Sequence, residues 1–156
     1  MSLAASIISS TLNAGTPLLI AAAGIVIHEK SGVLNLGIEG IMLMGAVCAF
    51  GTTLATGSFA LGFLAGIGIG LLLGLIFAFF TIGMYANQYA AGLALALFCT
   101  VLAAFIGKPL QGAALPTRAP LGIPGLEDIP FVGEALFSQH ILVYGALVLM
   151  ALVWWF

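Results

Sequence analysis

The chain has 156 residues, of which 63% are hydrophobic and only 5% charged, and its formal net charge is −2 at pH 7. A soluble domain carries about 25% charged residues, so this composition cannot supply the polar surface of a soluble globular protein. The small negative charge also gives no basic patch for nucleic acid. We therefore expect an integral membrane protein.

The first predicted membrane segment runs from about Ile7 to Ile27 and is uncharged. Pro17 lies inside it. Because proline removes a helical hydrogen bond, we expect a kink there, which a bundle of helices tolerates.

Residues 28–40, with the sequence HEKSGVLNLGIEG, connect this segment to the second one. Ionisable groups at such a junction are costly unless they face water, a partner or a pathway. Glycine permits backbone shapes that other residues resist, so Gly32, Gly37 and Gly40 allow a discontinuous second span. This span is expected to end near Thr56, where the residues Thr-Gly-Ser predict a short turn.

The third segment is predicted from Phe59 to about Met84, and glycine recurs in it at every fourth position. Small residues at this spacing line one face of a helix and let a neighbouring backbone approach closely. We favour static helix packing over a seam along which two helices slide past each other. The helix-packing residues are Gly62, Gly66, Gly70 and Gly74.

A polar break at residues 85–88 precedes the fourth segment, which is predicted from about Tyr89 to Gly107. Residues 40–107 contain no Asp, Glu, Lys, Arg or His. At roughly 20 residues per crossing, this stretch is long enough for three spans.

Residues 108–137 hold every proline of the chain except Pro17, together with most of its charged residues. Proline cannot continue a helix or donate a backbone hydrogen bond, so this stretch is expected to be an extramembrane loop. A last apolar run begins near Gln139 and continues to Phe156. The sequence thus predicts an all-α, polytopic transmembrane bundle of about five segments, forming a single domain over residues 1–156.

Several kinds of chemistry find no support in the residues. His28-Glu29 begins a zinc-protease pattern, but Gly32 stands where the second histidine is required. The sequence contains neither a phosphate-binding G-x-x-x-x-G-K-[ST] loop nor a G-x-S-x-G elbow. Cys48 and Cys99 lie in apolar runs without metal-ligand spacing, so we interpret both as small packing residues. We expect no enzymatic activity, no metal and no cofactor bound by this chain.

Three parts of the sequence resemble one known family. They are residues 22–46, the pair Asn87-Gln88 followed by AGLAL at 91–95, and the loop sequence PLGIPGL at 120–126 with IPF at 129–131 and LFSQ at 136–139. They are similar to the membrane-spanning permease subunits of bacterial ABC importers, in the ribose-type branch that handles simple sugars and nucleosides. The resemblance covers most of the chain.

The resemblance implies a translocation path for a nucleoside or simple sugar, in a multi-pass protein of the bacterial cytoplasmic (inner) membrane. The implied partners are a cytoplasmic ABC ATPase that binds ATP and Mg²⁺, a second permease subunit, an extracytoplasmic solute-binding protein or lipoprotein, and the lipid bilayer. Family topology places residues 28–40 toward the cytoplasm and residues 108–137 outside. In the family a coupling segment follows the span that here begins near Gln139, so we expect this chain to be the N-terminal portion of a longer permease.

Two other functions remain open. One is a structural or assembly subunit of a membrane complex without transport activity. The other is part of a secondary carrier, although such carriers usually bury ionisable groups, which the later spans of this chain lack.

The candidate residues for a substrate path or gate are Asn35, Glu39, Asn87 and Gln88. Glu39 is expected in the first turn of the second span, where a carboxylate complements the helix dipole; lining the path or meeting another subunit are the alternatives. Asn35 can satisfy freed backbone groups or contact a polar solute. Asn87-Gln88 are interpreted as a turn and helix start, with a pathway role as the alternative.

Overall fold

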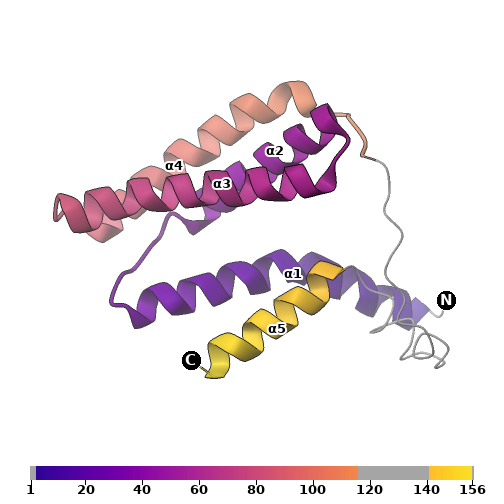
Figure 1. Cartoon of the computed structure of the whole chain (residues 1–156), viewed down its shortest axis with the longest axis horizontal. Helices are drawn as coiled ribbons and strands as arrows, with labels where there is room; N and C mark the ends of the chain where they lie inside the picture. Colours follow the sequence, from indigo (N-terminus) through magenta and orange to yellow (C-terminus); the bar gives the residue numbers. More distant parts are fainter. Residues whose placement is uncertain (1–2, 116–140, 156) are drawn as a thin grey trace. The chain divides into compact units, whose positions relative to one another are not determined.

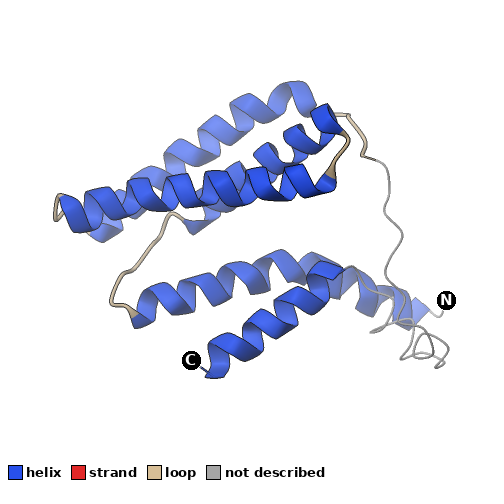
Figure 2. Ribbon diagram, viewed as in Figure 1, coloured by secondary structure: helices blue, strands red, loops and turns tan. Residues whose placement is uncertain are grey.

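A computed structural model describes residues 3–115 and 141–155, and their regular structure is entirely helical (Figures 1 and 2). The elements in chain order are α1 (Leu3–Lys30), α2 (Ile38–Thr56), α3 (Phe59–Ala78), the π-helical turn η1 (Phe79–Gly83), α4 (Gln88–Gly107), the 3-10 turn η2 (Lys108–Leu110) and α5 (Ile141–Trp155).

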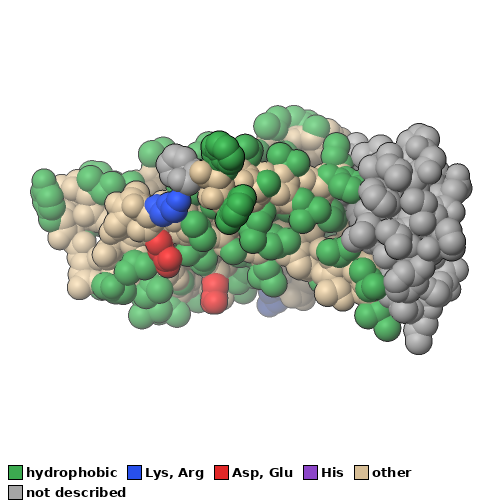
Figure 3. Space-filling view, turned by 90° about the horizontal axis from the view of Figure 1, so that it is seen from below, with side chains coloured by type: hydrophobic (Ala, Val, Ile, Leu, Met, Phe, Trp, Pro, Cys, Tyr) green, Lys and Arg blue, Asp and Glu red, His purple; other side chains and the backbone are tan. Residues whose placement is uncertain are grey.

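Four helical stretches in the described residues are long and apolar enough to cross a membrane, and α5 is a shorter apolar helix. The spans are Ser6–Lys30, Ile38–Thr56, Phe59–Gly83 and Gln88–Leu110. Hydrophobic side chains are spread along the helices on the face seen in Figure 3, where charged side chains are few. The predicted all-helical membrane bundle is confirmed, and so is the order of its segments.

Two features of the helices differ from those expected from the sequence. The first helix continues to Lys30 instead of ending near Ile27, because basic residues in a last helical turn interact favourably with the helix dipole. The second helix has no internal break. The residues that are not helical lie before it, between Lys30 and Ile38.

The described chain groups into two compact units, one holding α1 up to Ile27 together with α5, the other running from His28 through α2, α3 and α4. That residues 1–156 form one permease domain stays a prediction. Within the expected loop at 108–137, η2 ends at Leu110 and residues 111–115 are not helical. Residues 116–137 lie outside the described residues.

α2 is the central helix of the second unit, because it packs on both α3 and α4 (Figure 1). A buried cluster joins the three helices through Met44, Leu73, Cys99 and Ala103. The side chain of Cys99 is completely buried and is not in a disulfide, as its predicted role in packing requires.

The turn between α2 and α3 follows the prediction. Gly57 adopts φ +70°, in the left-handed region that favours glycine, and its N–H donates to the Thr53 carbonyl at 2.8 Å. The hydroxyl of Ser58 then caps α3 by accepting from the Leu61 N–H at 3.4 Å.

The glycine series of α3 meets α2 at one end only. A Cβ atom added at Gly62 would lie 2.7 Å from the Ala49 carbonyl oxygen, and one at Gly66 would lie 3.4 Å from the Ala49 Cβ. A Cβ at Gly70 or Gly74 would meet nothing within 4 Å. The close approach of α2 and α3 therefore uses Gly62 and Gly66, and a packing role for the other two stays a prediction.

This difference gives a matched pair of substitutions. Gly70→Ala should raise stability by up to about 1 kcal/mol, because alanine favours the helix more than glycine does. Gly62→Ala has the same helical gain but inserts a methyl group against α2, at a cost of about 1–3 kcal/mol. We expect Gly62→Ala to lower the midpoint of thermal unfolding in detergent, measured by loss of the monodisperse size-exclusion peak after heating. Equal shifts for the two variants would contradict the packing described here.

Candidate functional site

The connection between α1 and α2 opens with a turn that ends α1. Gly32 adopts φ +82°, and its N–H donates to the Glu29 carbonyl at 3.0 Å. The Val33 N–H donates to the His28 carbonyl at 3.1 Å. A left-handed glycine with paired bonds to the last helical turn is a common helix C-terminus. Gly32 is thus required by its backbone conformation.

Asn35 organises the other end of the connection. Its Oδ1 atom accepts from the Gly37 N–H at 2.8 Å, which makes a local turn directly before α2. The side chain of Asn35 is half-buried. Of the two interpretations of this residue, satisfying a freed backbone group is the one observed.

Gln88 ties the connection to the start of α4. Its Oε1 atom accepts from the Leu34 N–H at 3.0 Å. Leu34 is half-buried and belongs to no helix, so its N–H group has no helical carbonyl to pair with. One amide side chain therefore holds together two segments that are far apart in the sequence.

Asn87 caps α4. Its Oδ1 atom accepts from the N–H groups of Tyr89 at 3.0 Å and Ala90 at 3.2 Å. These donors are among those that the first turn of any helix leaves without a partner. The predicted turn and helix start at Asn87-Gln88 is confirmed.

The backbone of the connection lies directly against α4. A Cβ added at Gly92 would be 2.8 Å from the Leu36 nitrogen, and one at Gly40 would be 2.6 Å from the Ala96 carbonyl oxygen. A Cβ at Gly37 would be 3.0 Å from the Gly92 oxygen. Gly37 and Gly40 are thus needed for close approach, whereas sequence reasoning had attributed them to backbone freedom.

The partner of these glycines on α4 was missed by the sequence reasoning. The available signal was the spacing of Gly92 and Ala96, two small residues four positions apart on one helix face.

Glu39 lies in the first turn of α2, as predicted, and its side chain is exposed. The N-cap residue Gly37 makes no side-chain capping hydrogen bond, so the positive end of the helix dipole is open to a nearby carboxylate. The four predicted site residues do not form one cluster. Asn35, Asn87 and Gln88 order the junction of the connection with α4, and the exposed carboxylate of Glu39 takes no part in those hydrogen bonds.

A cavity of about 320 Å³ opens at this junction. Its polar lining residues are Thr81, Asn87, Gln88 and Tyr89, all uncharged, and its apolar ones are Val33, Ile82 and Ala86. Thr81 and Tyr89 were not selected from the sequence, although a hydroxyl inside an apolar span was an available signal for Thr81. In residues 3–115 and 141–155, no group of three His, Cys, Asp or Glu side chains is placed to hold a metal ion.

The contacts also show which of the loops that join the helices lie at the same end of the three spans. The bond from the Leu34 N–H to Gln88 places the start of α2 and the start of α4 at one end of the unit. At the other end, a Cβ added at Gly51 would lie 3.3 Å from a Leu110 methyl carbon. Residues 31–37 and 84–87 therefore lie on one side of the three spans, and the Gly57 turn and η2 on the other.

Comparison with known proteins gives a consistent result. A family described as "Branched-chain amino acid transport system / permease component" matches residues 7–156. TsgC13 of Haloferax volcanii, provisionally named a glucose ABC transporter permease protein, is 39% identical over 160 residues, which cover 100% of this chain and 49% of the relative. The guanosine ABC transporter permease protein NupQ of Bacillus subtilis is 34% identical over 96% of this chain and 50% of its own length.

The nucleoside ABC transporter permease protein NupC of Lactococcus lactis subsp. cremoris is 29% identical over 96% of this chain and 50% of its own length. The chain thus spans about half the length of the curated relatives it matches. No solved structure matches the chain significantly. With its apolar helices and a family match over residues 7–156, this multi-pass membrane protein belongs to the permease component family of branched-chain amino acid transport systems.

Proposed function

We propose that this chain is a membrane-spanning part of an ABC importer permease that carries a nucleoside or a simple sugar. The observation that carries the proposal is the family match over residues 7–156, which includes all the long apolar helices. The names of the relatives, which refer to glucose, guanosine and nucleosides, support this class of solute.

The proposed assembly requires other subunits. The sequence has no phosphate-binding loop of its own, so ATP and Mg²⁺ are bound by a separate cytoplasmic ABC ATPase. A second permease subunit completes the path, and an extracytoplasmic solute-binding protein or lipoprotein delivers the solute. We place the assembly in the bacterial cytoplasmic membrane, with residues 28–40 toward the cytoplasm and residues 108–137 outside.

The junction of residues 31–37 with α4 is proposed as a gate element. The side-chain oxygens of Asn35, Asn87 and Gln88 already accept hydrogen bonds from backbone N–H groups. These amide side chains therefore hold the junction in one conformation. During transport the connection moves relative to α4, and their hydrogen bonds break and re-form. Hydrogen bonds to neutral amide side chains can break and re-form at lower cost than buried ion pairs.

Glu39 is proposed to line the path beside this gate. Its carboxylate is exposed at the start of a membrane span, and an ionised group in that position needs water, a pathway or a partner. A polar solute such as a sugar or nucleoside offers hydroxyl groups that a carboxylate can accept hydrogen bonds from.

The function is tested on the intact complex, purified from its own membranes through a tag on the N-terminal region. Native mass spectrometry should find an ABC ATPase and a second permease, and proteoliposomes should take up guanosine or glucose only when ATP is supplied. Uptake driven by an ion gradient without ATP would identify a secondary carrier. The absence of both an ATPase and uptake would identify a structural subunit.

Glu39→Gln tests the role of the carboxylate in the complete transporter. We expect normal membrane insertion but uptake lowered several-fold, because the amide keeps the size of the side chain and loses its charge. Glu29→Gln, at an exposed residue of the last turn of α1, is the matched control and should leave uptake unchanged. Unchanged uptake with Glu39→Gln would leave only the helix-dipole interaction as its role.

Gln88→Leu tests the gate element. The substitution keeps the volume of the side chain but removes the acceptor of the Leu34 N–H, at a cost of about 1–3 kcal/mol if that donor stays without a partner. We expect the connection to loosen, so that a cysteine placed at Val33 reacts faster with a water-soluble maleimide. Gln111→Leu, at an exposed glutamine beyond η2, is the control. Equal reactivity in the two variants would show that the bond does not hold the connection.

A further inference from the structure

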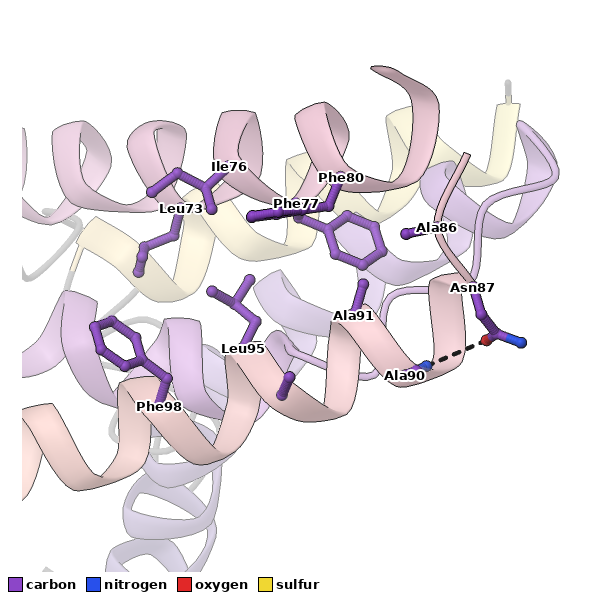
Figure 4. Close-up of a pocket in the computed structure, with 11 residues that line it drawn as sticks. Leu73, Ile76, Phe77, Phe80, Ala86, Asn87, Ala90, Ala91, Leu95 and Phe98 are labelled. Atoms are coloured by element: carbon purple, nitrogen blue, oxygen red, sulfur yellow. Dashed lines mark hydrogen bonds between the residues drawn. The ribbon is translucent and has the colours of Figure 1, made fainter. Parts of the chain in front are cut away.

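An apolar groove separates the end of α3 from the start of α4 (Figure 4). Its volume is about 420 Å³. The upper wall in Figure 4 carries Leu73, Ile76, Phe77 and Phe80, from α3 and η1, and the lower wall carries Leu95 and Phe98 from α4. The groove lies wholly within the unit formed by α2, α3 and α4.

The lining excludes a polar solute as the occupant. Its one polar residue is Asn87, whose side-chain oxygen already caps α4. The rest of the α4 wall is made of small apolar residues, among them Ala90 and Ala94. A sugar or nucleoside placed here would lose hydrogen bonds to water without replacement, which costs several kcal/mol in all.

One end of the groove adjoins polar groups. Ala86 and Asn87 line both this groove and the 320 Å³ cavity at the junction, whose other polar lining residues are Thr81, Gln88 and Tyr89. Tyr85 beside them is 91% exposed, and tyrosine is enriched where a membrane meets water. An apolar slot that leads into an uncharged polar cavity at this level matches a molecule with a hydrocarbon chain and a polar head.

We propose that a lipid of the surrounding bilayer binds here, with one hydrocarbon chain in the groove between α3 and α4 and its polar head at Thr81, Gln88 and Tyr89. Between helices and lipid tails the hydrophobic effect contributes little, because both are apolar. The hydrocarbon chain of the lipid is held by van der Waals contact with the walls of the groove. These contacts would be missing if the groove were empty. Since the polar cavity is lined by uncharged residues, no side chain of its lining selects for a charged head.

The test uses the complete transporter in proteoliposomes that contain phosphatidylcholine with a photoactivatable diazirine part of the way along one acyl chain. After illumination, labelled residues are mapped by mass spectrometry. We expect labelling of Phe80 and Phe98 to exceed that of Leu64 and Val101, exposed residues of the same helices outside the groove, by several-fold. Equal labelling would mean ordinary contact with bulk lipid and would overturn the proposal.

A pair of substitutions sharpens the test. Ala94→Phe fills the groove from the α4 side and should lower the labelling of Phe80 and Phe98 several-fold, whereas Ala104→Phe, at an exposed alanine of α4 outside the groove, should not. Unchanged labelling in Ala94→Phe would overturn the proposal. So would a photoreactive amino acid at position 98 that captures a protein segment, since a helix would then occupy the groove. The readout is lipid labelling, so either failure leaves the proposed transport function standing.

Discussion

The contact of residues 36–40 with α4 is the constraint on which the rest of the second unit depends. Added Cβ atoms at Gly37, Gly40 and Gly92 would all lie within 3.0 Å of backbone atoms or side-chain atoms across this contact. The start of α2 therefore packs closely on α4, and its position brings the Leu34 N–H within reach of Gln88. The same placement sets Met44 against Cys99 in the buried cluster. A close approach that these glycines permit thus underlies both the core and the junction.

The helices could be predicted because their causes are local. The uncharged stretch from Gly40 to Gly107 is long enough to cross a bilayer three times, so it predicts three spans. Gly57 ends one helix in a left-handed conformation, and the hydroxyl of Ser58 caps the next. The sequence predicts a first membrane segment that ends near Ile27, whereas α1 continues to Lys30. Lys30 lies in the last turn of α1, where a positive charge interacts favourably with the helix dipole.

The candidate site could be predicted only in part, and the division has a physical reason. The cap at Asn87 joins neighbouring residues, so its sequence position is sufficient to identify it. The bond between Leu34 and Gln88 and the contact of Gly40 with Ala96 join distant segments, and a local pattern carries no information about such partners. Gly70 shares the spacing of Gly62, yet only Gly62 meets a neighbouring helix. Spacing defines a face of a helix and leaves its partner undefined.

Three polar side chains at the junction accept hydrogen bonds from the backbone, and Glu39 differs from them. Asn35, Asn87 and Gln88 each accept a backbone N–H, so the turn, the cap and the attachment to α4 are complete without a charged residue. Glu39 adds to this only its interaction with the helix dipole, which is worth about 0.3–1 kcal/mol at an exposed position. A serine or asparagine at the N-cap stabilises a helix start by about as much without placing a charge at the membrane. The exposed carboxylate at position 39 is thus also available to water, to a solute or to a partner.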